Sequence, residues 1–206
     1  MTQTKSPTRR LSLSPEQIRA KILDAAADCL VDGGFASGRL LSAIARKAGL
    51  SRPTLYKYGG TIDDIKQALL ERELAAFLDA LAPRLRAVTW TVDGLADLLI
   101  FVVGYARGHT LLSAALRDVP ELVLPLFTLQ AADPIRVITQ MAEPIVQERI
   151  DDGTIPPVDV PVLTDFLFRI TLSTVLIRSD IDFDDPAVLR GYLHTAVRLA
   201  ADLPAS

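Results

Sequence analysis

Apolar residues recur at helical spacing along most of the chain, and the strict alternation typical of strands is nearly absent. Ser14-Pro15-Glu16-Gln17 precedes the first such run and combines an N-cap serine, a first-turn proline and a glutamine at the third helical position. Gly33-Gly34 follows the run, and glycine tolerates the left-handed turn that closes a helix. The pattern predicts a first helix from Ser14 to Gly33, with the apolar stripe Ile18, Ile22, Ala25, Ala26, Cys29 and Leu30.

Two short helices are expected next. Ser37 is predicted to cap one that stops at Gly49, and Ser51 is predicted to cap one that runs to about Tyr58. The pair Gly59-Gly60 breaks the second of them.

The rest of the chain is predicted to be helical. Thr61 is expected to cap a long helix that runs toward Leu81, where Pro83 ends or kinks it. Further helices, separated by Pro, Gly and Asp, are expected at Asp93–Thr110, Leu111–Asp118, Pro120–Ala132, Pro134–Asp151, Val160–Arg178 and Pro186–Asp202. The predicted fold class is therefore all-α.

The charges divide the chain into a basic head and an acidic body. Residues 1–60 contain ten Lys and Arg against four Asp and Glu, a net charge of +6. The remaining residues carry −9, because the whole chain of 206 residues carries −3. This asymmetry favours a polyanionic partner for the head. We expect a disordered basic arm at residues 1–13, a DNA-binding domain at 14–60 and a ligand-binding and dimerisation domain at 61–206.

Composition and run lengths exclude several classes of protein. The single Cys29 excludes an internal disulfide framework and a Cys-rich zinc site, and its place on the apolar stripe favours a structural thiol. The longest uncharged runs of the body, Leu98–Ala106 and Leu122–Ala132, are shorter than the roughly 20 residues of a membrane-spanning helix. No apolar signal segment opens the chain. We expect a cytoplasmic protein with no membrane partner.

Residues 41–58 have the spacing of a helix-turn-helix. Ala45 is small where two helices must approach, and Gly49 lies where the turn requires a positive φ. The second helix carries Arg52, Thr54 and Lys57 with few acidic neighbours, as expected of a helix that enters the DNA major groove. An ordinary helical hairpin with a solvated basic face is the alternative on spacing alone.

The motif Ile44-Ala45-Arg46-Lys47-Ala48-Gly49-Leu50-Ser51, with Thr54-Leu55-Tyr56 after it, resembles the N-terminal domain of TetR-family transcriptional regulators. Ile22-Leu23-Asp24-Ala25-Ala26 and Gly34-Phe35 extend the resemblance to about residues 15–70. It implies a homodimer whose three-helix head binds double-stranded operator DNA. It also implies a helical-bundle body that binds a small molecule and dimerises through its last two helices, here Val160–Arg178 and Pro186–Asp202.

By position, the resemblance assigns Arg52, Pro53 and Thr54 to base edges, and Tyr56 and Tyr58 to phosphates. The chemistry agrees in part. Arginine can form two hydrogen bonds to guanine, and a threonine methyl can contact a thymine methyl. Tyrosine hydroxyls and Lys57 can donate to phosphate oxygens.

Three positions depart from the family pattern. Leu40 stands where a Thr or Ser is usual, Gly59 where an aromatic residue is usual, and Ile62 where a phosphate-binding Lys is frequent. The departures at Gly59 and Ile62 remove phosphate contacts and leave open a second function. In that alternative, the chain is a helical partner- or ligand-binding protein that has lost specific operator binding.

The body offers weaker signals for a small-molecule site. Polar and aromatic candidates among its apolar helices are Trp90, Tyr105, His109, Thr110, Thr139, Gln140, Arg169 and Thr174. For each of them a surface position or a satisfied core position is the alternative, and His109 also suits a helix C-terminus. The identity of the ligand does not follow from the sequence.

No catalytic residue, metal site or cofactor is expected. Neither His109 nor His194 has a Glu three residues before it, as a di-iron helix bundle requires. The acidic run Asp180, Asp182, Asp184 and Asp185 lacks the Gly and Glu of a calcium loop, and Asp185 is better explained as the N-cap before Pro186. The predicted function is a ligand-responsive transcriptional regulator, a repressor that binds palindromic operator DNA as a dimer and is released when a small molecule binds.

Overall fold

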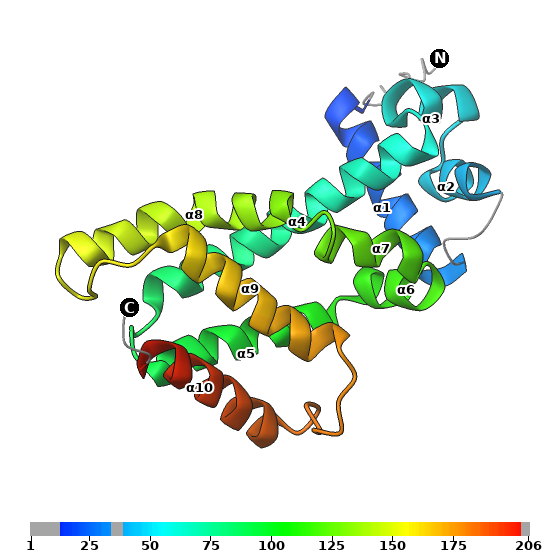
Figure 1. Cartoon of the computed structure of the whole chain (residues 1–206). Coiled ribbons are helices and arrows are strands. Elements are labelled where there is room, and N and C mark those ends of the chain that lie inside the picture. Colours follow the sequence, from blue (N-terminus) through cyan, green and yellow to red (C-terminus); the bar gives the residue numbers. More distant parts are fainter. Residues whose placement is uncertain (1–12, 34–38, 203–206) are drawn as a thin grey trace, which may run out of the picture. The chain divides into compact units, whose positions relative to one another are not determined.

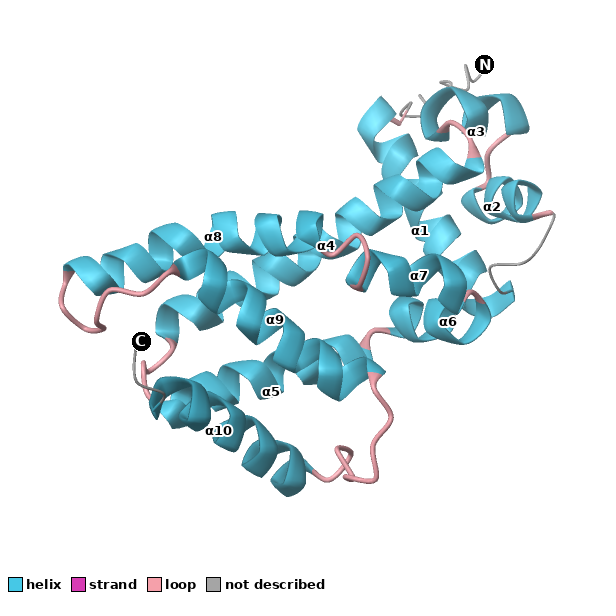
Figure 2. Cartoon of the chain, viewed as in Figure 1, coloured by secondary structure: helices cyan, strands magenta, loops and turns pink. Residues whose placement is uncertain are grey.

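The structure, a computed structural model, describes residues 13–33 and 39–202. Within these ranges the chain is helical and contains no strand (Figure 2), which confirms the predicted all-α class. The helices are α1 Pro15–Gly33, α2 Leu40–Ala48, α3 Arg52–Gly59, α4 Ile62–Ala87, α5 Val92–Gly108, α6 Thr110–Asp118, α7 Pro120–Phe127, α8 Ala132–Asp151, α9 Val160–Leu176 and α10 Pro186–Asp202 (Figure 1). The predicted basic arm, residues 1–13, lies almost wholly outside the described residues.

Two predicted helix ends were wrong. Helix α4 continues through Pro83 to Ala87 because Pro83 is exposed, so the carbonyl that loses its backbone partner can turn toward water. Helix α7 ends at Phe127 and not at Ala132. The hydroxyl of Thr128 donates to the Leu124 carbonyl at 2.8 Å and so competes with the backbone bond that would extend the helix.

The start of α2 also differs from the prediction. The helix begins at Leu40, with Arg39 at the N-cap and no side chain capping it. Ser37, the predicted cap, lies outside the described residues. Leu40 itself is buried, so at this position an apolar contact replaces a polar cap.

The chain divides into two compact units, Met1–Leu70 and Glu71–Ser206, and the division falls within α4. In the first unit both α2 and α3 pack against α1. Its core contains the almost completely buried side chains of Ile22, Leu30, Ile44, Leu55 and Ile65. Because Ile65 and the following Leu69 are buried, the start of α4 forms part of this unit, and the division lies beyond the boundary expected near Gly60.

Local sequence explains how the helices of the first unit start. Ser14 and Gln17 form the predicted capping box, with the Gln17 N–H donating to Ser14 Oγ at 3.2 Å and the Ser14 N–H donating to Gln17 Oε1 at 2.9 Å. Ser51 caps α3 by accepting the Thr54 N–H at 3.3 Å. These contacts satisfy backbone donors that a helix start leaves unpaired.

The start of α4 has a second capping box, and its Asp64 side chain leaves no room for a side chain at the preceding Gly60. The Thr61 N–H donates to Asp64 Oδ2 at 2.8 Å, and the Asp64 N–H donates to Thr61 Oγ1 at 3.2 Å. The hydrogen bonds from Thr61 hold the pKa of Asp64 below its usual value. Gly60 adopts φ 76°, and a Cβ there would lie 2.5 Å from Asp64 Oδ2, so only glycine fits.

The second unit is organised around α5. One face of α5 packs against α10 and α9, burying Ala96, Leu99 and Val103 with Leu189 and Leu193. Its next face buries Leu98 against residues of α4 and α8, with a border of aromatic side chains. Figure 1 shows α10 running alongside α5.

Arg107, near the end of α5, fastens the connection between α9 and α10. Its Nη1 donates to the Phe183 carbonyl at 2.5 Å and to Asp184 Oδ1 at 3.1 Å, and its Nη2 donates to the Thr174 carbonyl at 3.0 Å. Asp185 Oδ1 accepts the Ala187 N–H at 2.8 Å, the N-cap contact predicted for it. The acidic run before α10 is therefore held by an arginine and by helix capping.

Among the described residues no single helix is long and apolar enough to cross a membrane. Helices α5 and α6 reach that length and hydropathy only when taken together, and a bend of 62° separates them.

Two glycines with open surroundings test the turn between α2 and α3. An added Cβ would meet nothing within 4 Å at Gly49 or at Gly108. The two differ in backbone conformation, because Gly49 has φ 66° and Gly108 has no positive φ. Gly49→Ala should therefore lower the free energy of unfolding by about 1–2 kcal/mol, the cost of a left-handed backbone with a side chain. Gly108→Ala, the matched control, should be neutral or stabilising by up to about 1 kcal/mol. Urea unfolding followed by circular dichroism measures both, and equal effects would contradict this reading of the turn.

Candidate functional site

Helix α3 presents a basic and aromatic surface to solvent. Arg52, Pro53, Tyr56 and Lys57 are exposed, whereas Leu55 on the opposite side is buried in the first unit. Tyr56 has 53% of its surface exposed, although tyrosine rings usually bury much of their apolar surface. The exposed residues occur at positions that one side of a short helix can present together.

Thr54 and Tyr58, the other predicted DNA contacts on α3, are half-buried. The Thr54 and Ser51 hydroxyl oxygens lie 2.7 Å apart, so the Thr54 hydroxyl belongs to the helix cap and its methyl group is the part suited to a base contact. Lys57 Nζ lies 5.1 Å from the centre of the Tyr58 ring, a cation–π contact. The assignment of these six residues to DNA remains a prediction.

The turn that orients α3 has the features predicted for it. Gly49 adopts the left-handed conformation, and the Leu50 N–H donates to the Ala45 carbonyl at 2.9 Å, which closes α2. Ile44, Ala45 and Ala48 are buried on the side of α2 that packs in the unit. The small core and the single glycine together give α3 one orientation relative to α2.

Not every basic residue of the head is available to an anion. Lys47 Nζ lies 3.2 Å from Asp28 Oδ2 and 3.0 Å from Asp32 Oδ2, and hydrogen bonding to the two carboxylates raises the pKa of Lys47. This bridge joins α2 to α1, so two acids of the head offset one of its cations. The sequence did not reveal it, because the partners are separated in the chain and meet only when the helices pack.

The departures at Gly59 and Ile62 have different structural consequences. A Cβ at Gly59 would lie 3.2 Å from Ile22 Cγ2 and 3.3 Å from Ile65 Cδ1, so this glycine lies in a tight contact within the unit. Ile62 is half-buried in the first turn of α4, and its side chain has no donor to offer a phosphate.

Cys29 is only half-buried, although it lies on the apolar stripe of α1. Burial raises the pKa of its thiol, which favours the protonated form with low reactivity.

The candidates for a small-molecule site separate into two groups in the second unit. Thr139 and Thr174 donate their hydroxyls to carbonyls of their own helices, and Arg169 pairs with Asp165 at 2.5 Å. Gln140 and Thr110 are exposed. Trp90, Tyr105 and His109 instead adjoin one continuous set of apolar and aromatic side chains, so these three are the stronger candidates.

That aromatic set runs along α5. The ring of Tyr105 lies 5.2 Å from Phe77, 6.1 Å from Phe101 and 5.9 Å from His109, measured between ring centres. Phe77, Phe101 and Trp90 all pack against the core formed by α4, α5 and α8. The indole Nε1 of Trp90 is buried without a hydrogen-bond partner, so it is a donor that an acceptor on a ligand could use.

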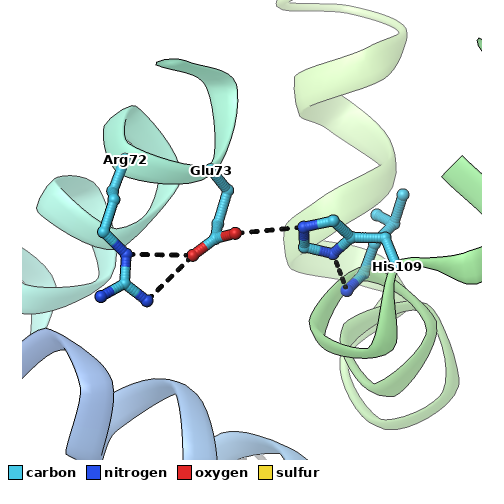
Figure 3. A network of polar contacts seen from close by, with 4 residues as sticks. Arg72, Glu73 and His109 are labelled. Atoms are coloured by element: carbon cyan, nitrogen blue, oxygen red, sulfur yellow. Dashed lines mark hydrogen bonds and ion pairs between the residues drawn. The ribbon is translucent and has the colours of Figure 1, made fainter. Parts of the chain in front are cut away.

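His109 joins α4 to the junction of α5 and α6 (Figure 3). Its Nδ1 accepts the Leu112 N–H at 3.1 Å, so His109 caps α6. The ring proton then lies on Nε2, which donates to Glu73 Oε2 at 3.1 Å. Arg72 donates to the other oxygen of Glu73 at 3.0 Å and 3.1 Å.

The placement of His109 corrects the alternative that it serves a helix C-terminus as a cation. The residue does follow α5, but its side chain acts on the N-terminus of α6, where a neutral acceptor is required. Sequence reasoning missed Arg72 and Glu73, since a charged pair on a long helix gives no sign of a partner from another helix.

The described residues contain no group of three or more His, Cys, Asp or Glu arranged to hold a metal ion. The first unit is a small helix-turn-helix head with an exposed basic helix, and the second is an all-helical body with a partly buried aromatic cluster.

Comparison with known proteins specifies the class further. Residues 22–69 match the profile of the bacterial regulatory proteins of the tetR family. No curated protein sequence is similar enough to match. The match covers the helix-turn-helix head and confirms the resemblance seen in the sequence.

Solved structures extend the likeness to the whole fold. A protein assigned to the TetR-family transcriptional regulators, from Mesorhizobium loti MAFF303099, has a TM-score of 0.67 and 16% identity over 91% of this chain and 96% of that chain. The TetR-family repressor AlkX from Dietzia sp. strain DQ12-45-1b has a TM-score of 0.60 and 20% identity over 95% and 99%. FadR from Bacillus subtilis, solved with stearoyl-CoA, has a TM-score of 0.59 and 21% identity over 89% and 97%. The chain has the fold of TetR-family transcriptional regulators.

Replacing His109 tests its two contacts separately. His109→Leu removes the cap of α6 and should lower the free energy of unfolding by about 1 kcal/mol. His109→Asn keeps a capping acceptor and should recover most of that loss, although it is too short to reach Glu73. Urea unfolding measures both variants. Equal losses in the two would show that the contact with Glu73, and not the cap, stabilises this junction.

Proposed function

We propose that the chain is a cytoplasmic, ligand-responsive transcriptional repressor that binds a palindromic operator as a homodimer and leaves it when a small molecule binds the body. The observation that carries the proposal concerns α3, the second helix of the helix-turn-helix. This helix exposes a basic surface to solvent while its Leu55 is buried in the head.

The chemistry of α3 supports two kinds of DNA contact. Arg52 can direct its guanidinium to guanine O6 and N7, and Pro53 and the Thr54 methyl can make apolar contacts in the major groove. Tyr56, Lys57 and Tyr58 can donate to phosphate oxygens. Phosphate contacts hold the head on any DNA, whereas base contacts select a sequence.

The surface of the body supports dimerisation through α9 and α10. In α9 the buried positions include Thr164, Thr171 and Thr174, whereas Val162 is 63% exposed and Phe166 only half-buried. An apolar helix that buries threonines and exposes larger apolar side chains favours a partner helix on its outer face. An isologous pair of such faces would also give the twofold symmetry of a palindrome.

Leu193 does not belong to this proposed interface. It is fully buried between α10 and α5 within one chain, together with Leu189 and Val197. The outer side of α10 carries the exposed Val188 and Leu199. Substitutions at Leu193 would therefore unfold the body and cannot test assembly.

The aromatic set of the body supports an apolar effector with a hydrogen-bond acceptor. Phe77, Phe101 and Tyr105 supply apolar surface, and Trp90 Nε1 supplies a donor without a partner. FadR was solved with stearoyl-CoA, and AlkX is implicated in the biodegradation of n-alkanes. Two proteins of this fold are thus associated with largely apolar molecules.

Selection from random DNA tests the proposal directly. Wild-type protein should enrich a palindromic sequence, and that sequence placed in a promoter should lower expression of a reporter when the protein is present. The alternative, a helical partner- or ligand-binding protein without operator binding, is supported instead if no sequence is enriched even at low salt.

Arg52→Ala and Tyr56→Phe form a pair that separates base reading from backbone contact. Arg52→Ala should weaken binding to the selected site by about 1–3 kcal/mol and relax the preference at one base position. Tyr56→Phe should weaken selected and random DNA alike. Fluorescence anisotropy with both DNAs measures this difference, and an equal effect of Arg52→Ala on both would make Arg52 a phosphate contact.

Charged substitutions on the outer faces of α9 and α10 test the dimer. Val162→Asp and Leu199→Asp should each yield a folded monomer, because a symmetric interface would bury the new charge twice without a partner. Leu129→Asp is the control, since Leu129 is 90% exposed in the connection between α7 and α8. Sedimentation measures the mass, and a dimer in both test variants would contradict this interface.

A further inference from the structure

Ser42 of α2 contacts the residue of α3 best suited to read a base. Nη2 of Arg52 donates a hydrogen bond to Ser42 Oγ. Ser42 is half-buried, while Arg52 is exposed at the first position of α3. The contact therefore connects α2 to the exposed basic surface of α3.

Both ends of this contact belong to a rigid frame. Ile44 and Ala45, near Ser42, are buried, and the left-handed Gly49 defines the turn that follows. Leu55, one turn beyond Arg52, is almost completely buried. The packing thus holds the backbone of Ser42 in place relative to that of Arg52, with Ser42 Oγ as the acceptor between them.

An acceptor held in place lowers the free-energy cost of ordering an arginine side chain. The free side chain samples many rotamers, and ordering it when DNA binds costs free energy. A hydrogen bond to Ser42 orders the side chain in advance. The other N–H groups of the guanidinium stay free to face O6 and N7 of a guanine.

We propose that Ser42 is a positioning residue for base recognition: it holds the Arg52 guanidinium in the orientation that reads guanine. The inference rests on the proposed function, since it requires that α3 enters the major groove. It assigns part of the operator specificity to α2, from a side chain that acts through Arg52.

Removing the hydroxyl tests the proposal. Ser42→Ala should weaken binding to the selected site about 2- to 10-fold, the cost of ordering one long side chain, and should relax the preference for guanine at one position. Binding to random DNA should stay unchanged. Ser42→Thr keeps the hydroxyl and should restore the preference. Circular dichroism and melting temperature show whether each variant is folded.

A double-mutant cycle separates positioning from direct contact. In the Arg52→Ala background, Ser42→Ala should have no further effect on the selected site, because the group it orders is absent. A loss that persists in that background, or an equal loss on random DNA, would make Ser42 a direct phosphate contact and overturn the proposal. Tighter binding by Ser42→Ala would also overturn it, since Ser42 would then hold Arg52 away from DNA.

The outcome for the wild type distinguishes the two proposals. If wild-type protein enriches no sequence, the proposed function fails before Ser42 is tested. If it enriches a site and Ser42→Ala selects the same site with the same affinity, the proposed function stands and the role of Ser42 is wrong.

Discussion

The burial of Leu55 against the helices of the head is the contact on which the exposed basic surface of α3 depends. Leu55 is almost completely buried, whereas Arg52, three residues before it, and Tyr56, directly after it, are exposed. A helix of this length is not stable alone, so packing supplies its stability and also selects which side faces outward. Gly49 completes the constraint, because its left-handed backbone lets α3 follow α2 at one angle.

In the body, α5 has the corresponding role. It packs on one side against α9 and α10 and on another against α4 and α8, so its two faces bury separate clusters. Polar contacts at its C-terminal end add to this packing. Arg107 ties the end of α5 to the connection between α9 and α10, and His109 ties the junction with α6 to Glu73 on α4. Both contacts join helices that are distant in sequence.

His109 and Ser42 illustrate how one polar side chain can connect two helices. His109 accepts a backbone N–H of α6 with one ring nitrogen and donates to a carboxylate with the other. Only the neutral ring can do both, since a protonated ring has no acceptor. Ser42 has a similar place in the head, where a hydroxyl of α2 meets a guanidinium of α3. Such contacts add orientation to packing, which by itself constrains helices mainly by shape.

The sequence by itself determined the all-α class, most helix limits, the capping box of Ser14 and Gln17 and the helix-turn-helix. These are local properties: the spacing of apolar residues, a capping hydroxyl and a glycine in a turn act over a few residues of the chain. The limits that the sequence missed, at Pro83 and Thr128, depend on whether a carbonyl faces water or a competing hydroxyl.

Only the tertiary structure decided which residues meet across helices. It paired Lys47 with Asp28 and Asp32, Glu73 with His109, and Ser42 with Arg52, and it turned Leu193 into the core of one chain. Apolar periodicity shows that a helix has a buried face, but it does not show whether a helix of the same chain or of a second copy covers that face. That choice follows from the packing of all the helices together, a property that no local segment contains.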